Sequence, residues 1–182
     1  MRALPPPQDQ EWLEALFELN ATKVRAYAIR RVGHDSADDI VSEVFATAWR
    51  RRHDVPEPAL AWLLRTAHHA VAHERRSLAR RLGVRDAVAG NLTDTSSPGA
   101  DASGRALAES VLSQLAPTDA EILRLTAWEQ LTPSEIAVVL DLSDSAARTR
   151  LMRARQRAKR LLDEPPAPSR AAAVPQLQGE PS

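Results

Sequence analysis

The sequence contains no cysteine, which excludes a disulfide framework, a thiolate metal site and a cysteine nucleophile. Aromatic residues make up only 4% of the chain, so a core must be built from Leu, Ala, Val and Ile. An apolar run long enough to span a membrane, about 18 residues, is missing, and residues 1–10 hold no apolar signal core. We therefore expect a soluble cytoplasmic protein that does not insert into a membrane.

The formal net charge is zero, but the charges are unevenly distributed. Residues 144–162 contain seven cationic side chains and one anionic side chain, Asp144. A second basic cluster lies in mid-chain and consists of Arg75, Arg76, Arg80, Arg81 and Arg85. Because local charge decides whether a surface attracts phosphate, these two segments favour contact with nucleic acid.

Proline and glycine divide the chain into segments whose apolar residues recur at helical spacing, and no segment alternates convincingly with period two. The pattern predicts an all-α protein with two small helical domains joined by a flexible linker. The first domain spans residues 9–82, with helices expected at 9–31, 36–52 and 59–82 and a possible break near Asn20. The linker spans 83–106, the second domain 107–162, and a disordered tail 163–182.

The second domain has the pattern of a helix-turn-helix. Residues 118–121 and 132–135 both fit the capping-box pattern Thr-x-x-Glu, and Leu131 can pack against the helix that follows the second box. A turn of three residues begins at Asp141, a residue type that tolerates a left-handed conformation, and Ser143 is expected to cap the last helix. That last helix shows a narrow apolar stripe and directs Arg148, Thr149, Met152, Arg155 and Lys159 outward. Such a helix suits the major groove of DNA.

The two helices before the linker carry polar faces of opposite character. In the helix at 36–52, with Asp35 or Ser36 as its expected cap, the outer face is acidic. In the helix at 59–82, Arg65, His69, His73, Arg76 and Arg80 fall on one side. Histidines four residues apart can bind a metal, but a third ligand is lacking and the neighbours are cationic, so we expect phosphate contact and no metal.

Three segments, in this order, resemble bacterial RNA polymerase sigma factors of the extracytoplasmic-function (ECF) type. Residues 35–49, DSADDIVSEVFATAW, look like the family's polymerase-binding helix, and residues 62–76, WLLRTAHHAVAHERR, look like its promoter-melting helix. Residues 115–125, 131–137 and 143–155 are similar to its final domain. The resemblance covers about residues 9–82 and 107–162.

The resemblance implies a role for each exposed face. The polymerase-binding residues would be Asp38, Asp39, Ser42 and Glu43, which would grip the clamp helices of the largest polymerase subunit. The minus-ten element would be contacted by Arg51, Arg52, His53, Arg65, His69, His73, Arg76 and Arg80, with an extruded base held at the 51–58 loop. The minus-thirty-five element would be contacted by Arg148, Thr149, Met152, Arg153 and Arg155.

We therefore predict a sigma factor that binds core RNA polymerase and promoter DNA, needs no cofactor and catalyses no reaction. An anti-sigma factor is a further partner that the resemblance allows. One alternative is a sigma-like adaptor that binds an anti-sigma regulator and has no promoter activity. Another is a repressor or activator that uses only residues 107–162, which leaves the first domain without a role. An enzyme is the weakest alternative, since a phosphate-binding glycine loop, a nucleophile motif and a convincing carboxylate pair are all lacking.

Overall fold

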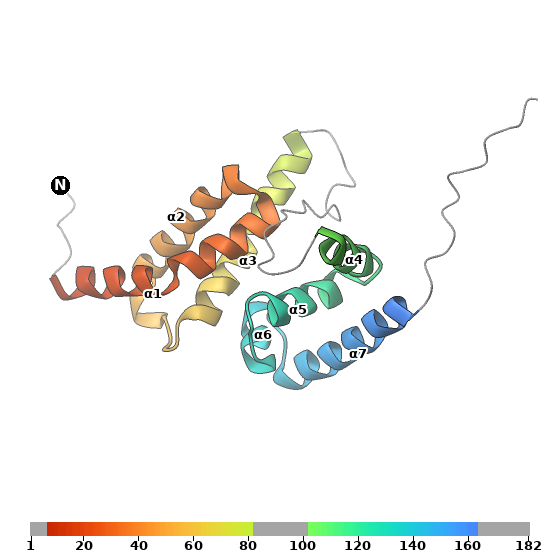
Figure 1. Ribbon diagram of the computed structural model, residues 1–182. Coiled ribbons are helices and arrows are strands. Elements are labelled where there is room, and N and C mark those ends of the chain that lie inside the picture. The colour runs from red at the N-terminus through yellow and green to blue at the C-terminus, as the bar shows by residue number, and fades with distance from the viewer. Residues whose placement is uncertain (1–6, 82–101, 164–182) are drawn as a thin grey trace, which may run out of the picture.

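The structure, a computed structural model, describes residues 7–81 and 102–163, and the regular secondary structure of these ranges is helical (Figure 1). The N-terminal region contains α1 (Pro7–Val32), α2 (His34–Arg50), the short 3-10 helix η1 (Arg52–Asp54) and α3 (Leu60–Arg81). The C-terminal region contains α4 (Ala102–Ser113), α5 (Pro117–Ala127), α6 (Pro133–Val139) and α7 (Asp144–Asp163). The prediction of an all-α protein with two helical regions is confirmed. In these described ranges, the helices are too short or too polar to cross a membrane.

The three helices of the N-terminal region pack against one another around fully buried Val24, Tyr27 and Leu63. The first helix is continuous, and the side-chain amide of Asn20 donates to the carbonyl oxygen of Leu16 at 2.9 Å instead of marking a break. Leu19, an apolar residue of α1, is 75% exposed. The buried stripe of α1 is therefore narrower than the sequence indicates.

The junction of α1 and α2 differs from the expected cap. Gly33 is the N-cap of α2 and has a φ of 79°, a left-handed conformation that glycine adopts without steric strain. Its amide donates to the carbonyl oxygen of Ile29 at 2.9 Å and so closes α1. Asp35 and Ser36, predicted as caps, lie inside α2, because one glycine both ends the first helix and begins the second.

The helix-turn-helix follows the predicted pattern closely. The Thr132 amide donates to the Glu135 carboxylate at 2.7 Å, and the Glu135 amide donates to the Thr132 hydroxyl at 3.3 Å, which completes a capping box at the start of α6. Asp141 has a φ of 54° in the turn, as expected. The Ser143 hydroxyl accepts a bond from the Ala146 amide at 3.2 Å and caps α7.

The other predicted capping box, at 118–121, is wrong. Helix α5 begins with Ala116 as its N-cap and Pro117 in its first turn, so Thr118 is already inside the helix. Proline has no amide proton and suits the first position of a helix, which shifts the start by two residues from the expected cap. The Glu121 side chain is consequently available for a different partner.

The boundary of the C-terminal region also differs from the expectation. Helix α4 begins at Ala102, within the segment 83–106 that was predicted as linker. Leu112, Leu115 and Ala120 form a small hydrophobic cluster, against which Ala158 and Leu161 of α7 pack. Residues 82–101 of the predicted linker and 164–182 of the predicted tail lie outside the described residues.

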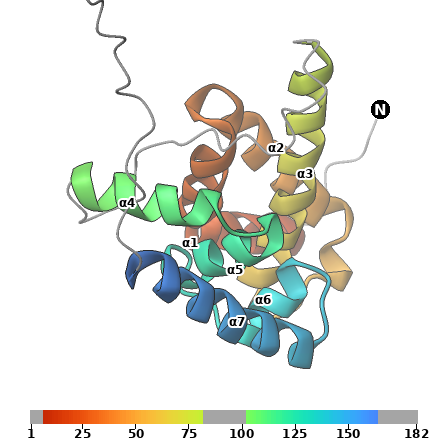
Figure 2. The ribbon, with the colours of Figure 1, turned by 90° about the vertical axis from the view of Figure 1, so that its right-hand side faces the viewer.

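The two regions share a single larger hydrophobic cluster. It contains Val24 and Leu64 of the N-terminal region together with Ile122, Leu125 and Ile136 of the C-terminal region. Helix α6 contacts α3, and Figures 1 and 2 show the two groups of helices side by side in both views. In this structure the two regions are therefore docked on each other.

Candidate protein and nucleic-acid interfaces

The acidic face of α2 is the first candidate interface. Because apolar residues at helical spacing turn the opposite side inward, the polar side faces solvent. The buried residues of this helix are Ala37, Ile40, Val44, Phe45 and Ala48. The four predicted polymerase-binding residues, Asp38, Asp39, Ser42 and Glu43, are all exposed. The structure brings them together on one face, while their role in polymerase binding stays a prediction.

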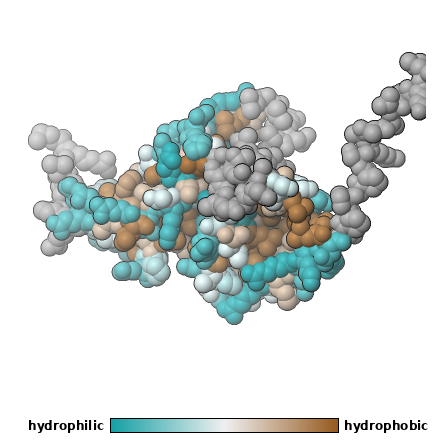
Figure 3. Space-filling model, viewed as in Figure 1, coloured by the Kyte–Doolittle hydropathy of each residue, from teal (hydrophilic) through white to brown (hydrophobic). Residues whose placement is uncertain are grey.

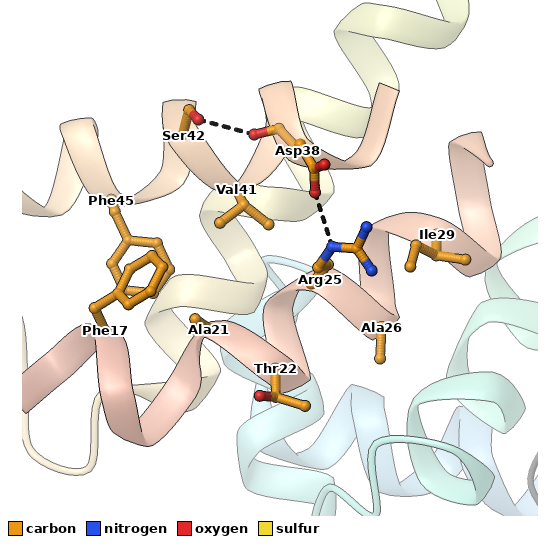
Figure 4. A pocket seen from close by; sticks show the side chains of 10 residues that line it. All are labelled: Phe17, Ala21, Thr22, Arg25, Ala26, Ile29, Asp38, Val41, Ser42 and Phe45. Carbon is orange, nitrogen blue, oxygen red and sulfur yellow. Dashed lines mark hydrogen bonds and ion pairs between the residues drawn. The ribbon is translucent and has the colours of Figure 1, made fainter. Parts of the chain in front are cut away.

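A groove of about 550 Å³ lies between α1 and α2 beside this acidic face (Figure 4). The rings of Phe17 and Phe45 lie in contact at one end of it, with centroids 4.8 Å apart and planes tilted by 57°. Arg25 Nε donates to Asp38 Oδ1 at 2.8 Å, and the Ser42 hydroxyl donates to the Asp38 carbonyl oxygen at 2.9 Å. The site thus combines an aromatic surface with an acidic edge.

Sequence reasoning missed the contribution of α1 to this groove. Phe17 is 47% exposed and directly follows Leu16, which is buried. Consecutive residues of a helix point about 100° apart, so Phe17 lies beside the buried side of α1 that contains Leu16. A large apolar side chain in that position indicates that it contacts a further surface. That signal was available in the sequence, whereas the pairing of Arg25 with Asp38 depends on how α1 and α2 cross.

The basic face of α3 is the second candidate interface. It consists of Arg65, His69, His73, Arg76 and Arg80, and each of these residues is exposed, as the helical spacing predicts. The inner side of α3 is built from Leu63, Leu64, Ala67, Ala70 and Val71, which are buried. The predicted minus-ten residues of α3 therefore form one continuous cationic surface.

The basic face of α3 is partly paired with the C-terminal region. Arg65 lies 2.5 Å from one carboxylate oxygen of Asp141, and His69 Nε2 lies 3.2 Å from the other. Asp141 belongs to the turn between α6 and α7. Its carboxylate thus occupies the end of the face at which Arg65 and His69 present their nitrogen atoms.

The three remaining minus-ten candidates, Arg51, Arg52 and His53, lie in the loop between α2 and α3 and differ in exposure. Arg51 and His53 are exposed, and Arg51 pairs with Asp54 at 3.3 Å. Arg52 is half-buried, donates to Asp9 at 2.9 Å and lies over the Trp49 ring at 5.2 Å from its centroid. Arg52 therefore ties the loop to α1, and its availability to DNA is lower than the sequence suggested.

Helix α7 forms the third candidate interface. Ala147, Leu151 and Ala154 are buried, as predicted, and the opposite side carries the exposed candidates Arg148, Thr149, Met152, Arg153 and Arg155. Figure 3 shows the hydrophilic outer side of α7, with hydrophobic side chains gathered above it. Arg148 pairs with Asp144 one turn earlier, and this hydrogen bond lowers the pKa of the Asp144 carboxyl.

A buried polar cluster, which the sequence did not reveal, lies where the two regions meet. Arg31 donates to Glu121 Oε1 through Nε at 3.0 Å and through a terminal nitrogen at 2.8 Å. Its other terminal nitrogen donates to Glu129 at 3.2 Å, and Arg30 donates to the same Glu129 oxygen at 2.7 Å. The Arg31 guanidinium also stacks over the Tyr27 ring, 3.5 Å from its centroid.

The environment shifts the pKa values of this cluster. Burial raises the pKa of Tyr27 well above its usual value and lowers the pKa of His68, whose Nδ1 lies 3.2 Å from the Tyr27 hydroxyl oxygen. Burial acts to raise the pKa of Glu121, but Arg31 outweighs it and the pKa is lowered. Glu121 and Arg31 are thus both charged in the folded protein. The Thr-x-x-Glu pattern had suggested a capping role for Glu121 and so concealed this pair.

Metal binding finds no support in the described part of the chain. Groups of three or more His, Asp or Glu side chains arranged to hold a metal ion are missing from residues 7–81 and 102–163. His69 and His73 are the two histidines whose spacing suggested a metal site. His69 Nε2 instead lies near the carboxylate of Asp141.

Two family matches cover the two helical regions. Residues 16–81 match Sigma-70 region 2, and residues 105–157 match Sigma-70 region 4. The chain belongs to the sigma-70 family. The predicted recognition as a sigma factor is confirmed at the level of this family, whose function is to bind RNA polymerase and promoters in transcription initiation, and the ECF type stays a prediction. The family is not enzymatic, in agreement with the prediction, and its region 4 contains the DNA-binding helix-turn-helix.

Two solved structures show the same fold. CnrH in complex with the cytosolic domain of CnrY matches with a TM-score of 0.57 and 24% identity over 85% of this chain and 89% of that one. The sigma factor RpoE in complex with the anti-sigma factor NepR from Bartonella quintana matches with a TM-score of 0.59 and 20% identity, over 87% and 98%. Curated proteins gave no significant match.

Proposed function

We propose that this sigma factor bridges core RNA polymerase and promoter DNA through three separate surfaces. The acidic face of α2 docks on polymerase, the basic face of α3 contacts the minus-ten element, and the outer face of α7 reads the minus-thirty-five element. The observation that carries the assignment is the sorting of charge on these helices. Each one buries its apolar side and exposes a face of one dominant sign.

The α2 surface suits a basic or amphipathic protein helix. Asp38, Asp39 and Glu43 supply negative charge, while Phe17, which packs on the buried Phe45 in the neighbouring groove, supplies an exposed apolar contact. Aromatic side chains at the centre of an interface with charged residues at its rim are typical of protein–protein recognition. We therefore assign the groove, as well as the acidic face, to polymerase binding.

The α3 surface suits single-stranded DNA. Its five cationic or titratable side chains follow one side of the helix, which is the arrangement that tracks a phosphate backbone. Arg51 and His53 extend this surface at the loop, and we assign Arg52 a smaller part because Asp9 pairs with it. A base extruded from the minus-ten element would be held at the 51–58 loop, beside this surface.

The α7 surface suits the major groove of duplex DNA. Arg148 and Thr149 lie in the N-terminal part of the helix, the part that reaches base edges in helix-turn-helix proteins. Met152 is 54% exposed and supplies an apolar contact, and we assign the exposed Arg153 and Arg155 to phosphate contacts.

We further propose that the chain works in the cytoplasm, where core polymerase is found. The second domain begins with α4 at Ala102, earlier than the position 107 expected from the sequence, and ends with α7 at Asp163. An anti-sigma factor is a further proposed partner. It is supported by the two similar structures, in which CnrH is bound to CnrY and RpoE to NepR. Such a partner would compete with polymerase for the α2 surface and its groove.

A reconstituted transcription assay tests this proposal. Purified protein and core polymerase are incubated with a random promoter library, and the transcripts and selected sequences are determined. We expect transcripts from a defined promoter class, loss of core binding in Asp39→Lys, and little change in Glu18→Lys, an exposed acid on α1. Equal core affinity of both variants would contradict the α2 assignment. Core binding without promoter-dependent transcripts would instead favour the adaptor.

A further inference from the structure

Asp144 is the one acidic side chain among residues 144–162, on a helix whose outer face is otherwise cationic. A carboxylate on a surface assigned to DNA repels phosphate and so lowers affinity unless it has another use. An acid in the first turn of a helix interacts favourably with the helix dipole, which would stabilise α7 without any effect on DNA recognition. The side-chain contacts of Asp144 indicate a second role.

The Asp144 carboxylate connects the two helices of the helix-turn-helix. The Ser134 hydroxyl of α6 donates to Asp144 Oδ2 at 3.0 Å, and Arg148 Nη2 donates to the same oxygen from the next turn of α7. Both hydrogen bonds lower the pKa of the Asp144 carboxyl, and the bond from Arg148 has the larger effect. The contacts therefore link α6, through a charged carboxylate, to the arginine that we assign to base reading.

The main chain on both sides of these contacts is held in place. Ser134 lies two residues after Thr132, the N-cap in the capping box of α6. Helix α7 is capped by Ser143, and Ala147, in its first turn, is fully buried. Helices α6 and α7 contact each other, and Figures 1 and 2 show α6 beside the start of α7. The Asp144 carboxylate thus has a defined position relative to both helices.

Arg148 stays accessible while it is paired. The side chains of Arg148 and Asp144 are 63% and 48% exposed. A free arginine loses rotamer entropy when it binds a base, and an arginine that is already restrained loses less. The carboxylate also repels a nearby phosphate, which favours a base edge over the backbone as the partner of the guanidinium. Among base edges, the planar arginine fork matches O6 and N7 of guanine.

We propose that Ser134 and Asp144 are positioning residues that hold Arg148 for a guanine of the minus-thirty-five element. This inference rests on the proposed assignment of α7 to duplex DNA. Asp144 restrains the guanidinium, Ser134 restrains Asp144, and both act through Arg148 without contacting the base themselves. Substitutions should therefore reduce the selectivity for guanine most at Arg148, less at Asp144 and least at Ser134.

Selection of duplexes by the reconstituted holoenzyme, from a library randomised at the minus-thirty-five element, tests this proposal. Arg148→Gln identifies the position that the arginine reads, where we expect the wild type to prefer guanine and this variant to lose about tenfold in selectivity. Asp144→Asn should lower the same selectivity about two- to fivefold, as for loss of an exposed ion pair. It should also raise the affinity for non-specific duplex, because a negative charge near phosphate is removed. An equal loss of affinity for every sequence would mean a merely structural role and would overturn the proposal.

Two further variants test the part of Ser134. Ser134→Ala removes the hydroxyl and should lower the selectivity for guanine by about twofold, whereas Ser134→Thr keeps a hydroxyl at this exposed position and should retain it. Asp163→Asn, at the far end of α7, makes the same change in charge as Asp144→Asn and should leave selectivity unchanged. Equal losses in Ser134→Ala and Ser134→Thr would overturn the role of the hydroxyl.

A double variant shows whether Asp144 acts through Arg148. Asp144→Asn added to Arg148→Gln should lower selectivity no further, and a further loss would mean that Asp144 itself contacts DNA. If only Arg148→Gln lowers selectivity, positioning by Asp144 and Ser134 is wrong and base reading by α7 stands. If Arg148→Gln leaves selectivity unchanged, the assignment of α7 fails and this proposal falls with it. A base other than guanine at the affected position would overturn the proposed target.

Discussion

The basic faces of α3 and α7 have similar composition but differ in what covers them. On α7, Thr149, Met152 and Arg153 face solvent, and Arg148 pairs only with Asp144 of its own helix among the contacts of the described chain. On α3, Arg65 and His69 pair with Asp141 of the other region. The surface proposed for duplex DNA is therefore open, whereas the surface proposed for melted DNA is partly occupied.

The contacts between the two regions are also of two kinds. The buried pairing of Arg31 with Glu121 and Glu129 joins the region that carries α3 to the region that carries α7. Asp141 adds an exposed contact between the same two regions. We therefore expect substitutions at the buried and the exposed positions to differ in the size of their effects.

The largest effect is expected from Arg31→Ala. This change leaves Glu121 without its arginine partner and Glu129 with Arg30 alone, so we expect the unfolding free energy to fall by about 3–5 kcal/mol in denaturant titrations. Arg25→Ala removes an exposed pair, in which Arg25 and Asp38 are 45% and 72% exposed, and should lower it by about 0–1 kcal/mol. Similar losses in the two variants would mean that the buried cluster does not hold the regions together.

A smaller effect is expected when residues on the exposed face of α7, which we assign to the minus-thirty-five element, are substituted. Arg148→Gln should reduce discrimination at one minus-thirty-five position by about 1–3 kcal/mol in selection from a duplex library. Lys159→Gln, farther along α7, should weaken DNA binding evenly for all sequences. It should also lower the slope of log affinity against log salt concentration by about one unit, which corresponds to the release of one counterion fewer. The assignment of base reading to Arg148 fails if both variants lower affinity without altering sequence preference.

The sequence predicts those features that local spacing determines. The capping box at Thr132, the left-handed Asp141 and the outward face of α7 all depend on residues within a few positions of one another. The pairing of Arg31 with Glu121 joins residues 90 positions apart, so it depends on how α1 and α5 meet in space. At Thr118 the local spacing predicted a helix cap that the structure does not contain, because α5 already begins at Pro117.

The two Thr-x-x-Glu segments provide the next test. Thr132→Ala removes a cap from α6, the helix that contacts α3 and precedes the turn, so we expect a loss of about 0.5–2 kcal/mol in thermal or denaturant unfolding. Thr118→Ala is the matched control, because Thr118 is exposed inside α5, and it should change stability far less. Equal losses would show that the capping bond at Thr132 does not stabilise the helix-turn-helix.

The smallest expected effect concerns the inner side of α3. Burial lowers the pKa of His68, so the folded protein prefers the neutral ring. The stability that follows is present above the unfolded value of about 6.5 and is lost as the pH falls below it. Unfolding measured between about pH 7.5 and 5 should show a weaker pH dependence in His68→Gln than in the wild type. An equal or steeper pH dependence in His68→Gln would contradict the buried position of His68.

The most direct test of the account measures the affinity of the holoenzyme for two DNA fragments. One is a duplex that carries the minus-thirty-five element, and the other is a single strand that carries the minus-ten element. The account predicts that Arg148→Gln weakens binding to the duplex alone and that Arg76→Gln weakens binding to the single strand alone. Equal losses on both fragments in each variant would contradict the assignment of α7 to duplex DNA and of α3 to melted DNA.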